Sequence, residues 1–186
     1  MAKVGNNIVV TGLSGKLGNL IVFRTHGAKT VVAQAPQKRE GESTEAQEQH
    51  QQRFQEAILY GKASISDAEK KAAYKASAEE GQSAFNVAVA DFLKAPHIDL
   101  IDVSHYSGQP DSYIAVRAVD DFKIAEVTVS IFNSDGSEVE HGAASVQTDG
   151  SWRYLVTTTN ESVTGDKIIV RATDLPGNLT EKEQAI

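Results

Sequence analysis

Two stretches in the second half of the chain, Ile114-Ala-Val-Arg-Ala-Val-Asp120 and Ile168-Ile-Val-Arg-Ala-Thr-Asp174, share the pattern Ile-x-Val-Arg-Ala-x-Asp. Each alternates apolar residues with polar or small ones and stops at an aspartate, which is typical of a strand with one buried face that ends at a turn. Nothing else recurs around the two copies. We therefore interpret them as two strands of one β-sandwich, not as a duplicated unit.

The same period of two continues on both sides of these stretches. The segments with strand character are Ile98–Val103, Tyr113–Val119, Ile124–Phe132, Glu138–His141, Trp152–Thr158, Lys167–Thr173 and Leu179–Ala185. Turns rich in Asn, Asp and Gly separate them, as at Asn133–Gly136 and Pro176–Asn178. Seven short strands with regular turn signals predict an immunoglobulin-like sandwich.

The first third of the chain has a different pattern. Extended apolar segments separated by glycines over residues 7–35 predict a β-hairpin or small meander. Thr44 with Gln47 has the spacing of a capping box, which predicts a helix that ends at Gly61.

A second capping box, Ser66 with Glu69, predicts a longer helix to about Leu93. Because both segments carry apolar residues at helical spacing, we expect an antiparallel helical hairpin. The residue before Pro96 is disfavoured in a helix, which places a boundary there.

The predicted fold class is therefore α+β with two domains. Residues 1–95 form a β-ribbon plus an antiparallel helical hairpin, and residues 97–186 form a seven-stranded Ig-like β-sandwich.

The second domain also resembles a known family. Asp149-Gly-Ser-Trp-Arg-Tyr154 and Ile169-Val-Arg-Ala-Thr-Asp-Leu-Pro-Gly-Asn178, preceded by Val127-Thr-Val-Ser-Ile131, are similar to bacterial Ig-like domains over residues 97–186. Such domains serve as spacers, adhesin modules, enzyme appendages and decorations of phage or injection-system particles. The N-terminal half, with Gly15-Lys-Leu-Gly-Asn19, loosely resembles uncharacterised bacterial proteins and carries no implied activity.

Composition excludes several classes of chemistry. The 186 residues contain no Cys, so disulfides, thiolate metal sites and cysteine nucleophiles are absent. No run of residues matches the apolar core of a signal peptide or a membrane helix. We expect synthesis in the cytoplasm without Sec export and no membrane insertion. The sequence leaves the final location open, with a released or cell-associated assembly as one option.

Charge is distributed unevenly along the chain. Residues 1–40 carry six basic side chains and one acidic side chain, whereas residues 97–186 carry six basic and fifteen acidic ones. The net charges of +5 and −9 favour basic-to-acidic contacts between copies, although two solvated surfaces are an equal alternative. The overall net charge of −7 and the scarcity of aromatic residues in the basic segment argue against a nucleic-acid partner.

The candidate catalytic motifs in the sequence lack residues that their chemistry requires. Gly12-Leu-Ser-Gly-Lys-Leu-Gly18 lacks the first Gly and the final Ser or Thr of a phosphate-binding loop, and Lys16 stands where a nucleophile elbow around Ser14 needs Gly. The five histidines show no metal-ligand spacing. We predict no enzyme activity and no cofactor.

Two weaker site hypotheses remain. Asp120, Asp121 and Asp174 follow the two repeated strands and could offer oxygens to Ca²⁺ at one end of the sandwich, but turn-capping aspartates are the favoured interpretation. Trp152 should face the core together with Tyr154, and an exposed aromatic platform for a glycan is the alternative.

The predicted function is therefore a non-enzymatic, homo-oligomeric assembly subunit that displays an Ig-like domain, as in a filament, tube, phage or injection-system-like particle. Association would add ribbon strands to a neighbouring subunit's sheet. The residues expected to carry it are Ile8, Val10, Leu20, Val22, Phe23, Val31 and Val32. The alternative is an adhesin-type module that binds a glycan or surface protein through the Ig-like domain, with Trp152 as its contact residue.

Overall fold

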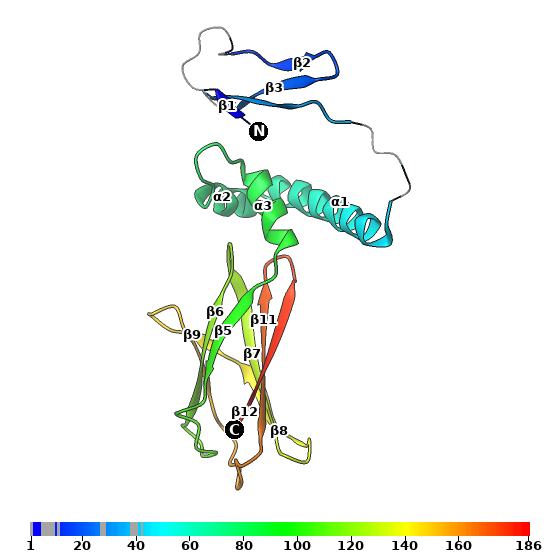
Figure 1. Ribbon diagram of the computed structural model, residues 1–186. Coiled ribbons are helices and arrows are strands. Elements are labelled where there is room, and N and C mark those ends of the chain that lie inside the picture. The colour runs from blue at the N-terminus through cyan, green and yellow to red at the C-terminus, as the bar shows by residue number, and fades with distance from the viewer. Residues whose placement is uncertain (1, 5–9, 11, 27–28, 38–40, 42) are drawn as a thin grey trace. The chain divides into compact units, whose positions relative to one another are not determined.

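Figure 1 presents the computed structural model of the chain, which describes residues 2–4, 10, 12–26, 29–37, 41 and 43–186. Backbone contacts divide the chain into two compact units. The first comprises residues 1–52 and 78–83, and the second comprises residues 53–77 and 84–186. The predicted α+β class is confirmed at this level, because helices and antiparallel sheets both occur.

The N-terminal strands form one antiparallel sheet. Its strands are β1 (Ala2–Val4), β2 (Gly15–Leu17), β3 (Ile21–His26) and β4 (Lys29–Gln34), in the order β1-β4-β3-β2. The β3–β4 hairpin pairs His26 with Lys29, as the predicted meander requires. The strand predicted at Asn7 lies mostly outside the described residues, and Val10 lies in a turn instead.

Three helices follow in place of the two expected: α1 (Glu45–Ser66), α2 (Ala68–Ala76) and α3 (Ala84–Leu93). Gly61 does not end α1. It lies inside the helix, at a position where a Cβ would come within 2.8 Å of Val89 Cγ2 and 2.9 Å of the Phe85 ring. The glycine thus marks a close helix crossing, which sequence inspection alone cannot distinguish from a helix end.

The predicted continuous helix from Ser66 to Leu93 is wrong. Asp67, not Ser66, caps α2, since its carboxylate accepts hydrogen bonds from the backbone N–H groups of Glu69 and Lys70. The helix stops after Ala76, and Gly81 then adopts a φ of +86° that a helix does not allow.

The remaining strands form two further antiparallel sheets. One has the order β5-β6-β10-β9, with bounds β5 (His97–Asp102), β6 (Tyr113–Val119), β9 (Ser145–Val146) and β10 (Trp152–Leu155). The other has the order β12-β11-β7-β8, with bounds β7 (Ile124–Phe132), β8 (Glu138–Ala143), β11 (Lys167–Asp174) and β12 (Leu179–Ala185). Strand β9 was not predicted, because two residues carry no period.

The two sheets share one apolar core, to which the repeated sequences contribute from both sides. Ile114 and Val116 of β6 and Ile168 and Val170 of β11 are all 0–1% exposed and belong to one hydrophobic cluster. The repeated Ile-x-Val-Arg-Ala-x-Asp pattern therefore occurs in two strands of different sheets, because each of these strands turns one face toward the same core. Helix α3 leads directly into β5 at one end of these sheets (Figure 1).

The crossing at Gly61 generates a first prediction. Replacing Gly61 by Leu should lower the free energy of unfolding by about 1–3 kcal/mol, because the added atoms must displace Val89 and Phe85. Ala63 is exposed on the same helix, so Ala63→Leu should change stability by less than about 0.5 kcal/mol. Urea unfolding of both variants makes the comparison, and equal effects would contradict a close crossing at Gly61.

Candidate functional site

Three carboxylates converge where α3 meets the ends of the two sheets. Asp91 comes from α3, Asp120 follows β6 and Asp174 ends β11. One oxygen from each lies within 4.8 Å of the others. The aspartates of both repeats therefore meet at the same end of the fold, as the calcium hypothesis required, but their third neighbour is Asp91.

Local turn chemistry orients two of these carboxylates. Asp120 Oδ2 accepts the backbone N–H groups of Phe122 and Lys123 at 3.1 and 2.9 Å. Asp174 Oδ1 accepts those of Gly177 and Asn178 at 2.9 and 2.6 Å. Both aspartates thus cap turns, which is the favoured interpretation in the sequence analysis. The carboxylates held by these turns lie close to each other.

Asp91 is the buried member of the cluster, with 1% of its surface exposed. Its Oδ2 accepts a hydrogen bond of 2.6 Å from the hydroxyl of Tyr74, which is itself bonded to the hydroxyl of Tyr60 at 2.8 Å. The ring of Tyr74 stacks on Phe122, with 4.3 Å between centroids. Asp91 Oδ1 is buried and has no hydrogen-bond partner among the described residues.

The surroundings change the acidity of both buried groups. The pKa of Asp91 is raised from 3.8 to about 6, chiefly by burial; the hydrogen bond from Tyr74 opposes the shift, and the negative charges of Asp120, Asp174 and Asp121 add to it. Burial, followed by the hydrogen bond to Asp91, raises the pKa of the Tyr74 hydroxyl far above its usual value. Tyr74 therefore remains a hydrogen-bond donor at any physiological pH.

Asn178 connects this cluster to the helices. Its amide nitrogen lies 3.3, 3.1 and 3.0 Å from the backbone carbonyl oxygens of Asp91, Phe92 and Lys94, and 2.7 Å from Asp174 Oδ2. Its amide oxygen accepts a hydrogen bond of 3.2 Å from Arg53. The two N–H groups of the Asn178 amide cannot donate fully to all four of these oxygens. The C-terminal end of α3 therefore keeps a partial negative charge.

Asp121 does not belong to the cluster. Its carboxylate forms an ion pair with Lys94, and both side chains are largely exposed. The three aspartates with oxygens within 4.8 Å of one another are Asp91, Asp120 and Asp174, so Asp91 stands in the place that the sequence analysis gave to Asp121. Asp91 was missed, although it is the single charged residue of α3 and follows Ala88 at helical spacing.

Trp152 is half-buried and packs against the shared core, while Tyr154, two residues along β10, is 5% exposed. The remaining face of Trp152 lines an open hollow of about 300 Å³ together with Asp120 and Val146. Trp152 thus packs against the core with one part of its side chain and remains partly exposed, so features of both interpretations of this residue are present.

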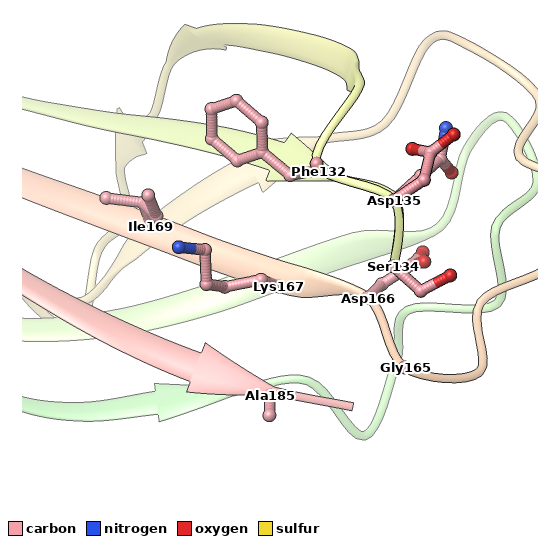
Figure 2. Close-up of a pocket in the computed structure, with 10 residues that line it drawn as sticks. Phe132, Ser134, Asp135, Gly165, Asp166, Lys167, Ile169 and Ala185 are labelled. Atoms are coloured by element: carbon pink, nitrogen blue, oxygen red, sulfur yellow. The ribbon is translucent and has the colours of Figure 1, made fainter.

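A larger open hollow, of about 580 Å³, lies at the end of the sheets away from α3 (Figure 2). Figure 2 shows the β7–β8 turn with Asp135 and the loop with Asp166 on one side of it, and Phe132 and Lys167 on the other. Asp166 is buried and accepts a hydrogen bond of 2.6 Å from Asn160. These groups stabilise loops, and no catalytic pairing is evident among the residues that line the hollow.

The residues predicted to mediate self-association lie in or beside the N-terminal sheet. Val22 and Phe23 of β3 and Val31 and Val32 of β4 are half-buried. Leu20 lies in the turn before β3 and is 76% exposed. Val10 is half-buried in a turn, and Ile8 lies outside the described residues.

Comparison with known proteins adds no assignment: no family model matches this sequence, and no curated protein is significantly similar to it. Among the helices that the structure describes, none combines the length and apolar character needed to cross a membrane.

The raised pKa of Asp91 generates a second prediction. The folded state binds the Asp91 proton more tightly than the unfolded state does, so this group's stabilising contribution decreases as pH rises from about 4 to about 6. Asp91→Asn cannot ionise and places an amide beside two carboxylates. We expect it to be more stable than the parent at pH 8 by about 2–3 kcal/mol, at about 1.4 kcal/mol per pKa unit.

The measurement is urea unfolding of both proteins with a chelator present, at pH 8 and at pH 4.5. The advantage of Asp91→Asn should shrink at pH 4.5, where the Asp91 carboxyl is protonated in the parent. A variant that is less stable than the parent at pH 8 would contradict the assigned burial of charge.

Proposed function

We propose that the chain is a non-enzymatic assembly subunit that self-associates through its N-terminal sheet and displays an Ig-like domain, as in a filament, tube, phage or injection-system-like particle. The observation that carries the proposal is that few of the described residues of the N-terminal unit are buried. Among the residues of the first unit whose exposure is described, only Thr30 and Ala35 are buried.

Apolar side chains of that unit remain in contact with solvent. Leu13, Leu17 and Leu20 are 43%, 64% and 76% exposed. A sheet of four short strands gains stability by covering an apolar face, and the described residues of this unit do not cover it. A second copy of the chain is the occupant we propose.

The open edges of the sheet refine how strands could be added. Strands β3 and β4 each pair with a neighbour on both sides, so their backbone groups are largely committed within the sheet. The free edges belong to β1 and β2. We therefore propose strand addition at β1 or β2, with side chains of β3 and β4 contributing a contact face.

Charge complementarity supports association between copies. The net charge of +5 over residues 1–40 and that of −9 over residues 97–186 attract each other when the first segment of one copy meets the second segment of another. Such attraction weakens with salt over a screening length of about 10 Å at 0.1 M.

The order of the strands supports an Ig-like sandwich for residues 97–186. The sheets β5-β6-β10-β9 and β12-β11-β7-β8 correspond to strands A-B-E-D and G-F-C-C′ of an immunoglobulin-like fold. The chain changes sheet between β6 and β7, between β8 and β9 and between β10 and β11, as that strand assignment requires. The single Trp departs from the antibody pattern because Trp152 lies on the E-like strand and not on the C-like strand β7.

The third prediction concerns self-association. We expect the weight-average molecular mass of the protein, measured by analytical ultracentrifugation, to rise with protein concentration at low salt. Replacing both Leu17 and Leu20 by Ser removes apolar contact without changing charge. It should raise the concentration needed for association by about tenfold or more, since two exposed leucines provide more than about 1.4 kcal/mol of burial.

The matched control replaces Leu155 and Leu179, which are 52% and 57% exposed on the second unit, by Ser. This control should associate like the parent. A parent that stays monomeric at low salt and high concentration would refute the proposal, as would equal weakening by both double variants. Electron microscopy of the parent tests directly for rings or filaments.

The alternative function, a glycan- or protein-binding module, retains one supporting observation, the exposed face of Trp152 over its hollow. Under the assembly proposal, Trp152→Ala should reduce the free energy of unfolding by about 2–3 kcal/mol through lost packing, and the parent should bind no glycan selectively. Urea unfolding and a glycan array test the two statements. Selective binding by the parent that Trp152→Ala abolishes would favour the adhesin-type function.

A further inference from the structure

We propose that Asp91, Asp120 and Asp174 form a Ca²⁺ site that joins helix α3 to both sheets. The inference is independent of the proposed assembly function, because it concerns a different part of the chain. It rests on three observations: convergence of the carboxylates, a buried unpartnered oxygen and an uncompensated negative charge.

The spacing of the three carboxylates is compatible with calcium. One oxygen from each aspartate lies within 4.8 Å of the others. Oxygen ligands lie about 2.3–2.6 Å from Ca²⁺, so two ligands on opposite sides are about 4.6–5.2 Å apart. The corresponding span for Mg²⁺ is about 4.0–4.2 Å in a rigid octahedron, so three carboxylates fixed by three separate elements suit the larger and more tolerant ion better.

The buried unpartnered oxygen is the independent sign of a ligand. Asp91 is 1% exposed, and its Oδ2 is occupied by the Tyr74 hydroxyl, but Oδ1 has no partner. A buried carboxylate oxygen without a donor costs free energy that a cation would recover. In the proposed site, the Tyr74 hydroxyl would hold Asp91 Oδ2 while Oδ1 binds the ion.

The local charge balance also calls for a cation. Among the residues that the structure describes, no Lys, Arg or His forms an ion pair with Asp91, Asp120 or Asp174. Two basic side chains in this part of the fold have other partners, since Lys94 pairs with Asp121 and Arg53 donates to the Asn178 amide oxygen. The carbonyl end of α3 adds a partial negative charge.

The other two carboxylates are oriented in advance. Backbone N–H groups of the turns at Phe122 and Gly177 hold Asp120 and Asp174 in place, and Asn178 holds the second oxygen of Asp174. A preformed site loses less conformational entropy on binding. The ion would fasten one residue of the helices to one residue of each sheet, so that α3 keeps a fixed orientation on the sheets.

The experiment uses the full chain, freed of metal by chelation and dialysis, at pH 8. Isothermal titration with CaCl₂ and, separately, MgCl₂ measures binding, and thermal unfolding measures stabilisation. We expect one Ca²⁺ per chain, an unfolding temperature that rises with the Ca²⁺ concentration, and binding of Mg²⁺ at least about tenfold weaker.

Asp91→Asn and Asp174→Asn should each weaken Ca²⁺ binding by about tenfold or more, because each removes a charged ligand. Asp91→Asn also keeps the fold intact, as its expected gain in stability without metal predicts. The matched control is Asp121→Asn, the neighbour of Asp120 that pairs with Lys94, which should bind Ca²⁺ within about threefold of the parent.

Three results would overturn the proposal. One is the absence of Ca²⁺ binding by the parent at millimolar concentrations. Another is an equal loss of binding in Asp121→Asn. The third is stabilisation of the metal-free parent by acidification together with no response to Ca²⁺ at pH 8, which would mean that a proton alone neutralises the buried charge.

Discussion

The buried polar junction at the end of α3 is the constraint on which the second unit depends. Asn178 donates to carbonyl oxygens at the end of this helix while Arg53 of α1 binds its amide oxygen. Tyr74 links α2 to Asp91 and stacks on Phe122 of the β6–β7 turn. The Tyr74–Asp91 bond is buried, whereas the half-buried Asn178 forms bonds that reach the surface at Arg53 and Lys94; together they connect the three helices to the two sheets. The same junction leaves Asp91 Oδ1 buried and without a hydrogen-bond partner among the described residues.

The two units use apolar residues in opposite ways. In the second unit, strands of both sheets direct their alternate side chains into a single core, where Val127 and Val129 are fully buried. In the first unit, Leu17 of β2 and Leu20 of the turn before β3 stay exposed. The proposal of association rests on this contrast between the core of the second unit and the exposed apolar residues among the described part of the first unit. The proposed assembly function follows from this contrast, whereas the proposed calcium site follows from the junction.

Local pattern predicted the strands well and the helices less well. The bounds of β6, β7 and β12 were predicted without error, because alternation over seven or more residues bounded by turns has few alternative interpretations. The helical segment from Ser66 onward was read as continuous, since its apolar spacing persists through the break before Ala84. The predicted helix end at Gly61 is wrong because glycine is favoured both at helix ends and where two helices cross closely. The contacts with Val89 and Phe85, which the sequence does not show, identify a close crossing.

By itself, the sequence determined the α+β class, the positions of the long strands and the turn-capping role of Asp120 and Asp174, because each depends on residues near one another along the chain. Only the tertiary structure decided that these two aspartates meet, that Asp91 completes the group and that Asp121 does not. The third member comes from a helix about thirty residues before Asp120, and local periodicity carries no information about which distant segment covers the end of a sheet. Packing of the α3 end against the β11–β12 turn supplies that information.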